Sequence, residues 1–339
     1  MFSVPLCLYI LQCLTEKMGN IMKQYQIPNT ELKVSALCFG GGSFGTSIKG
    51  KGADLLVSAF VEAGGCYFDT AHCYSFWEKD GLGASEREFG ACLKRLGYWN
   101  KVVVGTKGGH PDGGENYRRP DAYMSESMIN SDVGESLERL GSDRIDLYYL
   151  HRDDPRMPVA EVIGLLNREI ERGRIRYIGA SNWQTQRIME ANEYASKHGL
   201  QGFVASQVQW SLAEPNWKPG PDPIMRYVTE EDREWYASVG MSIVAYSATA
   251  GGYFASSHGS SGTYDNPTNI KRRKRAEELA SNLNCTPVQI AMAYLLHQKP
   301  LTIPIFLTTN QAHLTEIMDS VSINLSDEQV HWLMDEEKR

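Results

Sequence analysis

Short apolar runs alternate with longer segments of helical periodicity from Met22 to the end of the chain. Eight runs have the length of a strand, at residues 36–40, 66–69, 102–106, 145–150, 175–179, 204–208, 243–246 and 301–305. Most lack polar and apolar alternation, as strands buried on both faces do. Eight successive βα units predict an α/β fold that closes into a (β/α)8 TIM barrel. The alternative is a doubly wound open sheet, but no Gly-x-Gly-x-x-Gly turn follows the first strand.

Several predicted helices have recognisable ends. Ser85 and Glu88 have the spacing of a capping box, and Gly97 would end the helix that they begin. Three further helices are marked by apolar spacing over 159–170, by Thr286 before Pro287, and by Ser326 with Gln329.

A β-hairpin is predicted ahead of the barrel, where segments 25–27 and 32–34 flank a turn at 28–31. It would plug the bottom of the barrel, so that residues 22–339 form one barrel domain. Residues 1–21 form an N-terminal extension whose apolar run is shorter than the roughly 20 residues of a membrane span. A start assigned too far upstream, with Met18 or Met22 as the true beginning, is the favoured explanation. A genuine extension and a signal peptide or membrane-edge anchor are the alternatives.

Charge and cysteine content exclude some classes of protein. A net charge of -7 would repel nucleic acid, which is bound by neutralising phosphates with Lys and Arg. The seven cysteines form no Cys-x-x-Cys pair, which predicts reduced thiols, a cytoplasmic location and no metal site. We therefore expect an enzyme that acts on a small molecule, without a membrane or nucleic-acid partner.

Polar residues follow several predicted strands directly. Catalytic side chains of TIM barrels project from the carboxyl ends of the strands, so these positions are the candidates for chemistry. The segments are Phe-Asp-Thr-Ala-His-Cys-Tyr at 68–74, Thr-Lys at 106–107, Leu-His at 150–151, Ser-Asn at 181–182 and Gln-Val-Gln-Trp at 207–210.

These five segments, in this order, resemble the aldo-keto reductase family over the chain from about Met22 onward. The resemblance implies an NAD(P)H-dependent oxidoreductase that interconverts a carbonyl and an alcohol. It assigns proton transfer to Asp69, Tyr74, Lys107 and His151. The chemistry agrees: an ammonium beside Tyr74 would lower its pKa from about 10, Asp69 would keep Lys107 charged, and His151 would polarise the carbonyl oxygen.

The resemblance also implies a cofactor site. Ser181, Asn182 and Gln207 would bind the nicotinamide carboxamide, and Trp210 would stack on the ring. The remaining candidates for cofactor binding are Gly41, Gly42, Ser247, Ala248, Gly251, Thr308, Thr309 and Asn310, of which the last three would also cap the following helix.

The adenosine end departs from the family pattern, because Leu307 and Thr309 stand where a basic residue for the 2′-phosphate is common. NADP remains the expected cofactor, with NAD as the alternative. The basic run 271–275 either compensates for the missing charge or, as we favour, forms a solvated helix face.

Substrate contacts are expected on the same face of the barrel. The candidates are His72, Trp77, His110, Arg152, Asp153 and Trp183. Aromatic plates mixed with charged groups suit a polyhydroxylated, sugar-derived carbonyl. Two long loops, 211–223 and 248–269, follow strands and are predicted to lie beside the site.

Two other classes remain open. A TIM-barrel hydrolase or lyase would also carry Asp, Lys and His at strand ends, but would not require a Tyr–Lys pair. A non-catalytic nucleotide-binding regulatory subunit would keep the cofactor residues and could lose the proton relay, whereas all four proton-transfer residues are present here.

Overall fold

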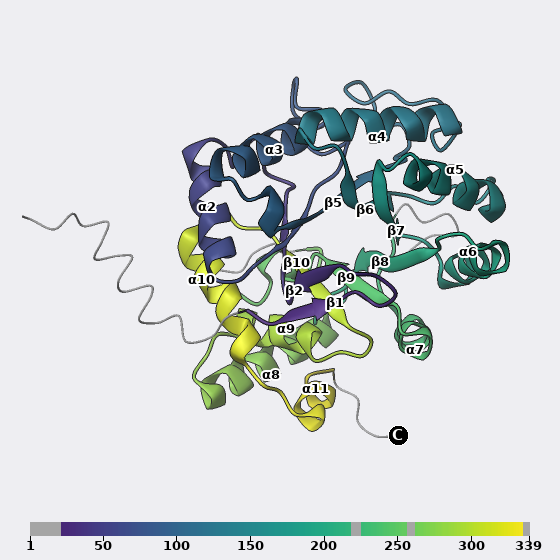
Figure 1. The fold of residues 1–339 in the computed structure, drawn as a ribbon. Coiled ribbons are helices and arrows are strands. Elements are labelled where there is room, and N and C mark those ends of the chain that lie inside the picture. The colour runs from purple at the N-terminus through teal and green to yellow at the C-terminus, as the bar shows by residue number, and fades with distance from the viewer. Residues whose placement is uncertain (1–21, 218–224, 256–261, 335–339) are drawn as a thin grey trace, which may run out of the picture.

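Eight parallel strands close into a barrel, as the sequence predicts (Figure 1). The computed structural model describes residues 22–217, 225–255 and 262–334, so the predicted extension 1–21 lies outside the described residues. In barrel order the strands are β10 (Thr302–Phe306), β3 (Cys38–Gly40), β4 (Tyr67–Asp69), β5 (Val103–Gly108), β6 (Ile145–Leu150), β7 (Ile175–Ser181), β8 (Phe203–Gln209) and β9 (Ser242–Tyr246).

Helices surround the barrel and cover the outer faces of its strands (Figure 1). They are α2 (Lys51–Glu62), α3 (Ala84–Leu96), α4 (Glu126–Leu140), α5 (Val159–Glu171), α6 (Thr185–His198), α7 (Glu230–Val239), α8 (Pro267–Leu283), α9 (Pro287–Leu296), α10 (Gln311–Asp319) and α11 (Asp327–Met334). The second long loop ends at Asn266, where α8 begins, and not at 269. Because all barrel strands are parallel, their carboxyl ends share one face, and side chains that follow them are brought together there.

The barrel closes where the last strand pairs with the first. Phe306 of β10 lies opposite Phe39 of β3, and their rings stack with centroids 5.0 Å apart. Phe60 of α2 packs edge-on against both rings and against Phe68 of β4. This aromatic cluster joins both ends of the barrel sequence to the first outer helix.

A short hairpin covers the end of the barrel where the parallel strands begin. Strands β1 (Gln24–Gln26) and β2 (Lys33–Ser35) pair antiparallel, as predicted to within one residue. Ile27, Leu32 and Val34 are buried among the apolar side chains that fill the barrel. The hairpin therefore plugs the end of the barrel that lies away from the strands' carboxyl ends.

The predicted helix starts are partly correct. Thr286 and Gln289 form a capping box at α9, and the backbone N–H of Ser326 donates to Gln329 ahead of α11. The predicted capping box of Ser85 and Glu88 is wrong, because α3 begins one residue earlier, after Gly83. The Ser85 hydroxyl is buried and instead donates to the backbone oxygen of Gly41, which ties the helix to the strand ends.

We expect Phe60→Ala to destabilise the fold by about 3–5 kcal/mol, because it removes the ring that joins α2 to the closure of the barrel. Leu55→Ala is the matched control on the same helix, since Leu55 is 64% exposed, and should cost less than about 1 kcal/mol. Urea unfolding of both variants measures the difference. Equal losses would mean that the cluster does not close the barrel.

Candidate active site

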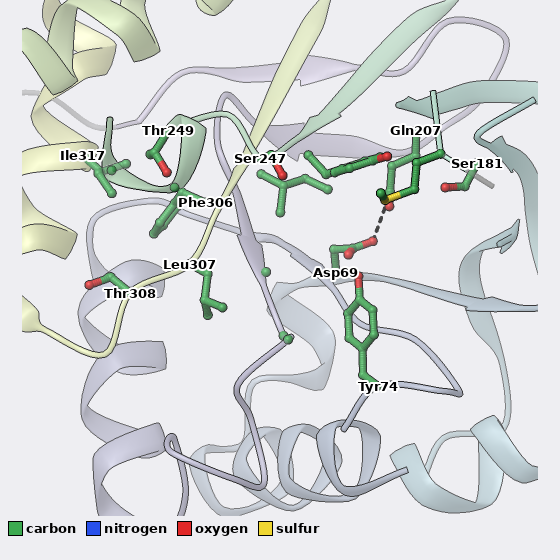
Figure 2. Close-up of a pocket in the computed structure, with 18 of the residues that line it drawn as sticks. Asp69, Tyr74, Ser181, Gln207, Ser247, Thr249, Phe306, Leu307, Thr308 and Ile317 are labelled. Atoms are coloured by element: carbon green, nitrogen blue, oxygen red, sulfur yellow. Dashed lines mark hydrogen bonds between the residues drawn. The ribbon is translucent and has the colours of Figure 1, made fainter. Parts of the chain in front are cut away.

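A cavity of about 680 Å³ opens at the carboxyl ends of the strands. It runs from Tyr74 to a distal end formed by Leu307, Thr308 and Ile317 (Figure 2). Of the predicted site residues, those that line it are Gly41, Gly42, Asp69, Tyr74, His151, Arg152, Ser181, Asn182, Gln207, Ser247, Gly251 and Thr308. Its volume is in the range of small-molecule and cofactor sites.

Lys107 is buried beneath the Tyr74 end of the cavity, with a side chain only 1% exposed. Its Nζ donates to Asp69 Oδ2 at 2.6 Å, to the backbone oxygen of Thr70 at 2.7 Å and to Tyr74 Oη at 3.0 Å. Burial lowers the pKa of Lys107, but Asp69 and Tyr74 outweigh it, so the pKa lies above its usual value. An ammonium has three hydrogens, and all three have acceptors here.

Tyr74 therefore accepts a hydrogen bond from Lys107 and keeps its own hydrogen available. Burial raises the pKa of Tyr74, and the nearby Lys107 only partly offsets that rise. The expectation that Lys107 would bring the pKa of Tyr74 below its ordinary value is thus wrong, since burial is the larger effect. Tyr74 is protonated at neutral pH, with its O–H free to donate into the cavity.

His151 lies beside Tyr74, with ring centroids 5.9 Å apart. Burial and the neighbouring Arg152 hold the pKa of His151 well below its usual value, so the ring is neutral at pH 7. Its Nδ1 lies 3.4 Å from the Cys73 sulfur, and burial raises the pKa of that thiol to about 12. A protonated thiol that donates to Nδ1 leaves the hydrogen of the ring on Nε2, as a donor.

The side chains that were expected to bind a nicotinamide carboxamide form hydrogen bonds with other residues of the protein. Gln207 donates to Asp69 Oδ1 at 2.8 Å, a contact drawn in Figure 2. Asn182, at φ 61°, accepts from the backbone N–H of Arg226 and from the Tyr246 hydroxyl. Asn182 thereby fixes the orientation of the Tyr246 ring, which lines the cavity.

Trp210 is placed differently from the prediction. It is 5% exposed, packs edge-on against Tyr294 and lines a separate, smaller cavity with Tyr227 and Arg272. Tyr246, at the end of β9, lines the main cavity instead. The rule that selects residues at strand ends would have found Tyr246, because it is the last residue of the seventh barrel strand.

Comparisons with known proteins place this architecture in a family. Residues 36–335 match the family model described as "Aldo/keto reductase family". The chain belongs to the aldo/keto reductase family. Members are oxidoreductases, and the family implies a nicotinamide cofactor and a small carbonyl substrate.

Relatives are similar over most of their length. "Norsolorinic acid reductase A" of Aspergillus parasiticus is 27% identical over 91% of this chain and 79% of its own. "Probable aldo-keto reductase 1" of Glycine max is 29% identical over 90% and 88%. The crystal structure of the thermostable aldo-keto reductase Tm1743 with the inhibitor epalrestat has a TM-score of 0.71, with 22% identity over 92% of this chain and 99% of that one. The last likeness supports the (β/α)8 barrel fold.

The middle of the cavity is built from tight turns. Ser247, at φ 55°, begins a turn that continues through Gly251, and both residues line the cavity. Ala248 is fully buried and points away from it, so its side chain is not a cofactor contact. Gly41 must be glycine, because a Cβ there would lie 2.8 Å from the backbone oxygen of Asp69.

The distal end carries little positive charge. Helix α10 contributes His313, Glu316 and Ile317, which lie on one helix face. The sequence analysis missed these residues, although their spacing of three and four positions could have shown that they share a face. Asn310 caps α10 through the backbone N–H of Ala312, as predicted, whereas Thr309 is exposed and lies outside the lining.

The basic run 271–275 does not supply the missing charge, since none of its residues lines the main cavity. Nor is it wholly the solvated face that we expected. Arg272 is 4% exposed and donates to the backbone oxygen of Leu212 and to Glu214.

Of the six predicted substrate residues in this aldo/keto reductase, only Arg152 lines the main cavity. Trp183 is a core residue, and Asp153 is paired with Arg187. His72 is buried, Trp77 is 54% exposed, and His110 packs against His151 with ring centroids 4.9 Å apart. The Glu135 side chain that contacts His72 is 41% exposed. Within the described ranges, no group of three or more His, Cys, Asp or Glu is arranged to bind a metal, and no helix is long and apolar enough to span a membrane.

His110 makes the stability of this reductase depend on pH. Burial and Arg152 lower the pKa of His110 to about 4, below the 6.5 of the unfolded chain. The unfolded state therefore binds more protons below pH 6.5, so stability is present above that pH and is lost as the pH falls toward 4. Between pH 7 and pH 5 the free energy of unfolding of the wild type falls. We expect the fall in His110→Gln to be smaller by about 2 kcal/mol.

Urea unfolding at the two pH values measures this effect. The exposed His198 provides the control, because His198→Gln should show the same loss as the wild type. An unchanged loss in His110→Gln would contradict the assignment.

Proposed function

We propose that this chain reduces an aldehyde or ketone to an alcohol, with Tyr74 as proton donor and a nicotinamide dinucleotide as hydride source. The observation that carries the proposal is the saturation of the Lys107 ammonium by Asp69, Thr70 and Tyr74, which leaves the Tyr74 O–H to donate. When bound, the reduced dinucleotide supplies a hydride to the carbonyl carbon.

The residues of the chain act on the carbonyl oxygen. His151 donates to that oxygen and polarises the C=O bond, and Tyr74 transfers its proton as negative charge develops there. The resulting phenolate is stabilised by the Lys107 ammonium, 3.0 Å away. Because burial raises the pKa of Tyr74, the acid form is present at neutral pH, which favours carbonyl reduction over alcohol oxidation.

The two other classes receive less support. A carboxylate base for hydrolysis is not free at the Tyr74 end of the cavity, because Asp69 is engaged by both Lys107 and Gln207. Among the described residues the cavity has one further carboxylate, Glu316, at the distal end. A regulatory subunit would not need a Tyr74 hydroxyl that is held with its hydrogen free.

The expectation of a sugar-derived substrate is weakened, because Trp77, Asp153 and Trp183 do not line the cavity. A sugar-derived carbonyl compound remains one of the substrates to test in a panel. The observed cavity presents Arg152, Tyr74 and His151 to the carbonyl compound.

We expect Tyr74→Phe to lower the rate of carbonyl reduction by roughly 10²-fold to 10⁴-fold, the usual loss on removing an acid catalyst. Dinucleotide affinity, followed by tryptophan fluorescence, should stay within about 3-fold of the wild type, because Phe keeps the ring. Tyr25, a half-buried residue of β1 outside the cavity lining, provides the control variant Tyr25→Phe. Near wild-type turnover in Tyr74→Phe would remove Tyr74 from the mechanism.

For the dinucleotide, family frequency favours NADPH, but the distal end of this cavity favours NADH. Arg152 is the sole Lys or Arg in the described lining, and it lies beside His151 at the other end. The distal end instead presents Leu307, His313 and Glu316. A 2′-phosphate would meet the Glu316 carboxylate with no fixed cation beside it, whereas an unmodified ribose diol would not be repelled.

We expect NADH to bind at least as tightly as NADPH, and Leu307→Lys to tighten NADPH by about 5-fold, the effect of one partly exposed ion pair. Leu307→Gln is the control, with similar length and no charge, and should not change the NADPH to NADH ratio. Fluorescence titration measures both dissociation constants. Tenfold tighter NADPH binding by the wild type would contradict this preference.

A further inference from the structure

One cation that lines the cavity has no ion-pair partner among the described residues. Arg152 follows His151 at the end of β6 and lines the cavity beside Tyr74. Its Nη1 donates to the backbone oxygen of His151 at 2.7 Å, while its Nε is buried without a hydrogen-bond partner. Elsewhere in the described residues, no carboxylate forms an ion pair with Arg152.

The neighbouring charges on the same loop are paired. Asp153 binds Arg187 at 2.7 Å, and Asp154 binds Arg156 at 2.8 Å. The two carboxylates that follow Arg152 in sequence therefore have other partners. A partly buried charge costs free energy unless it is paired, and the described residues provide no carboxylate partner for Arg152.

The titratable groups that act most strongly on Arg152 are phenols and a thiol, not carboxylates. They include Tyr246, Cys73 and Tyr74. Burial lowers the pKa of Arg152, and none of these groups compensates as a carboxylate would. A guanidinium presents its donors in a plane, the geometry that matches a carboxylate.

We propose that Arg152 determines substrate specificity by binding a carboxylate of the substrate, so that the preferred substrates are aldehydes or ketones that also carry a carboxylate. The proposal rests on the proposed function, since it concerns the carbonyl compound that reacts at Tyr74. It assigns Arg152 to the substrate and not to the dinucleotide, because Arg152 interacts with Tyr74. Tyr74 lies at the other end of the cavity from Thr308 and Ile317 (Figure 2).

The test compares two substrates that differ in one charge, 4-carboxybenzaldehyde and methyl 4-formylbenzoate. The wild type should have the higher kcat/KM for the carboxylate. Arg152→Gln should lower kcat/KM for the carboxylate by about 10-fold to 100-fold, chiefly through KM, and change that for the ester less than 3-fold. Arg152→Lys should recover part of the loss, since it restores the charge without the planar fork.

Arg156→Gln is the matched control, because Arg156 is an exposed arginine of the same loop that lies outside the cavity lining. It should leave both substrates unchanged. Thermal melting of each variant separates loss of folding from loss of recognition.

A binding measurement keeps this proposal separate from the proposed function. Calorimetric titration of the enzyme–dinucleotide complex with benzoate, which has no carbonyl to reduce, should show binding that Arg152→Gln abolishes. Loss of benzoate binding in Arg152→Gln would support the anion site even if the enzyme reduced no aldehyde. The absence of aldehyde reduction would overturn only the proposed function.

Three results would overturn the assignment of Arg152. The first is an equal loss with acid and ester, which would place Arg152 in the shared machinery. The second is weaker dinucleotide binding in Arg152→Gln, which would make the cofactor its partner. The third is a higher kcat/KM for 4-formylphenyl phosphate than for the carboxylate.

Discussion

The buried ammonium of Lys107 is the interaction on which the rest of the site depends. Removing a charge from water costs several kcal/mol, and it is tolerated only where opposite charge and acceptors surround it. Asp69 supplies the charge, Thr70 and Tyr74 complete the set of acceptors, and Gln207 holds the second oxygen of Asp69. The ammonium thus fixes how β4, β5 and β8 present their ends, and it determines which way the Tyr74 hydroxyl can donate.

Around this centre, the cavity divides its charges between its two ends. Arg152, which has no ion-pair partner among the described residues, places positive charge beside Tyr74 and His151, and burial together with this charge keeps His151 neutral. Glu316 places negative charge at the distal end. An acidic carbonyl compound at one end and a dinucleotide without a 2′-phosphate at the other would match this distribution. The same barrel scaffold thus acquires specificity from a few residues at strand and helix ends.

The barrel and the placement of Asp69, Tyr74 and His151 at its cavity could be predicted because their signals are local. The apolar runs give the positions of the strands. Lys107 and His151 are identified because each directly follows such a run. Predictions failed where packing between distant segments decides. Trp183 stands at a strand end like the others, yet it is a core residue, and nothing in its neighbourhood of the sequence distinguishes the two outcomes. Ser85 has the spacing of a cap, but contact with Gly41 buries it within the helix.

The most direct test of the central claim is a double-mutant cycle on Tyr74 and Lys107. If the ammonium acts only through the phenol, the rate of carbonyl reduction in the Tyr74→Phe, Lys107→Met double variant should equal that of Tyr74→Phe within about 3-fold. A rate loss in the double variant equal to the product of the losses in the two single variants would contradict the claim. It would show that Lys107 serves the reaction independently of Tyr74.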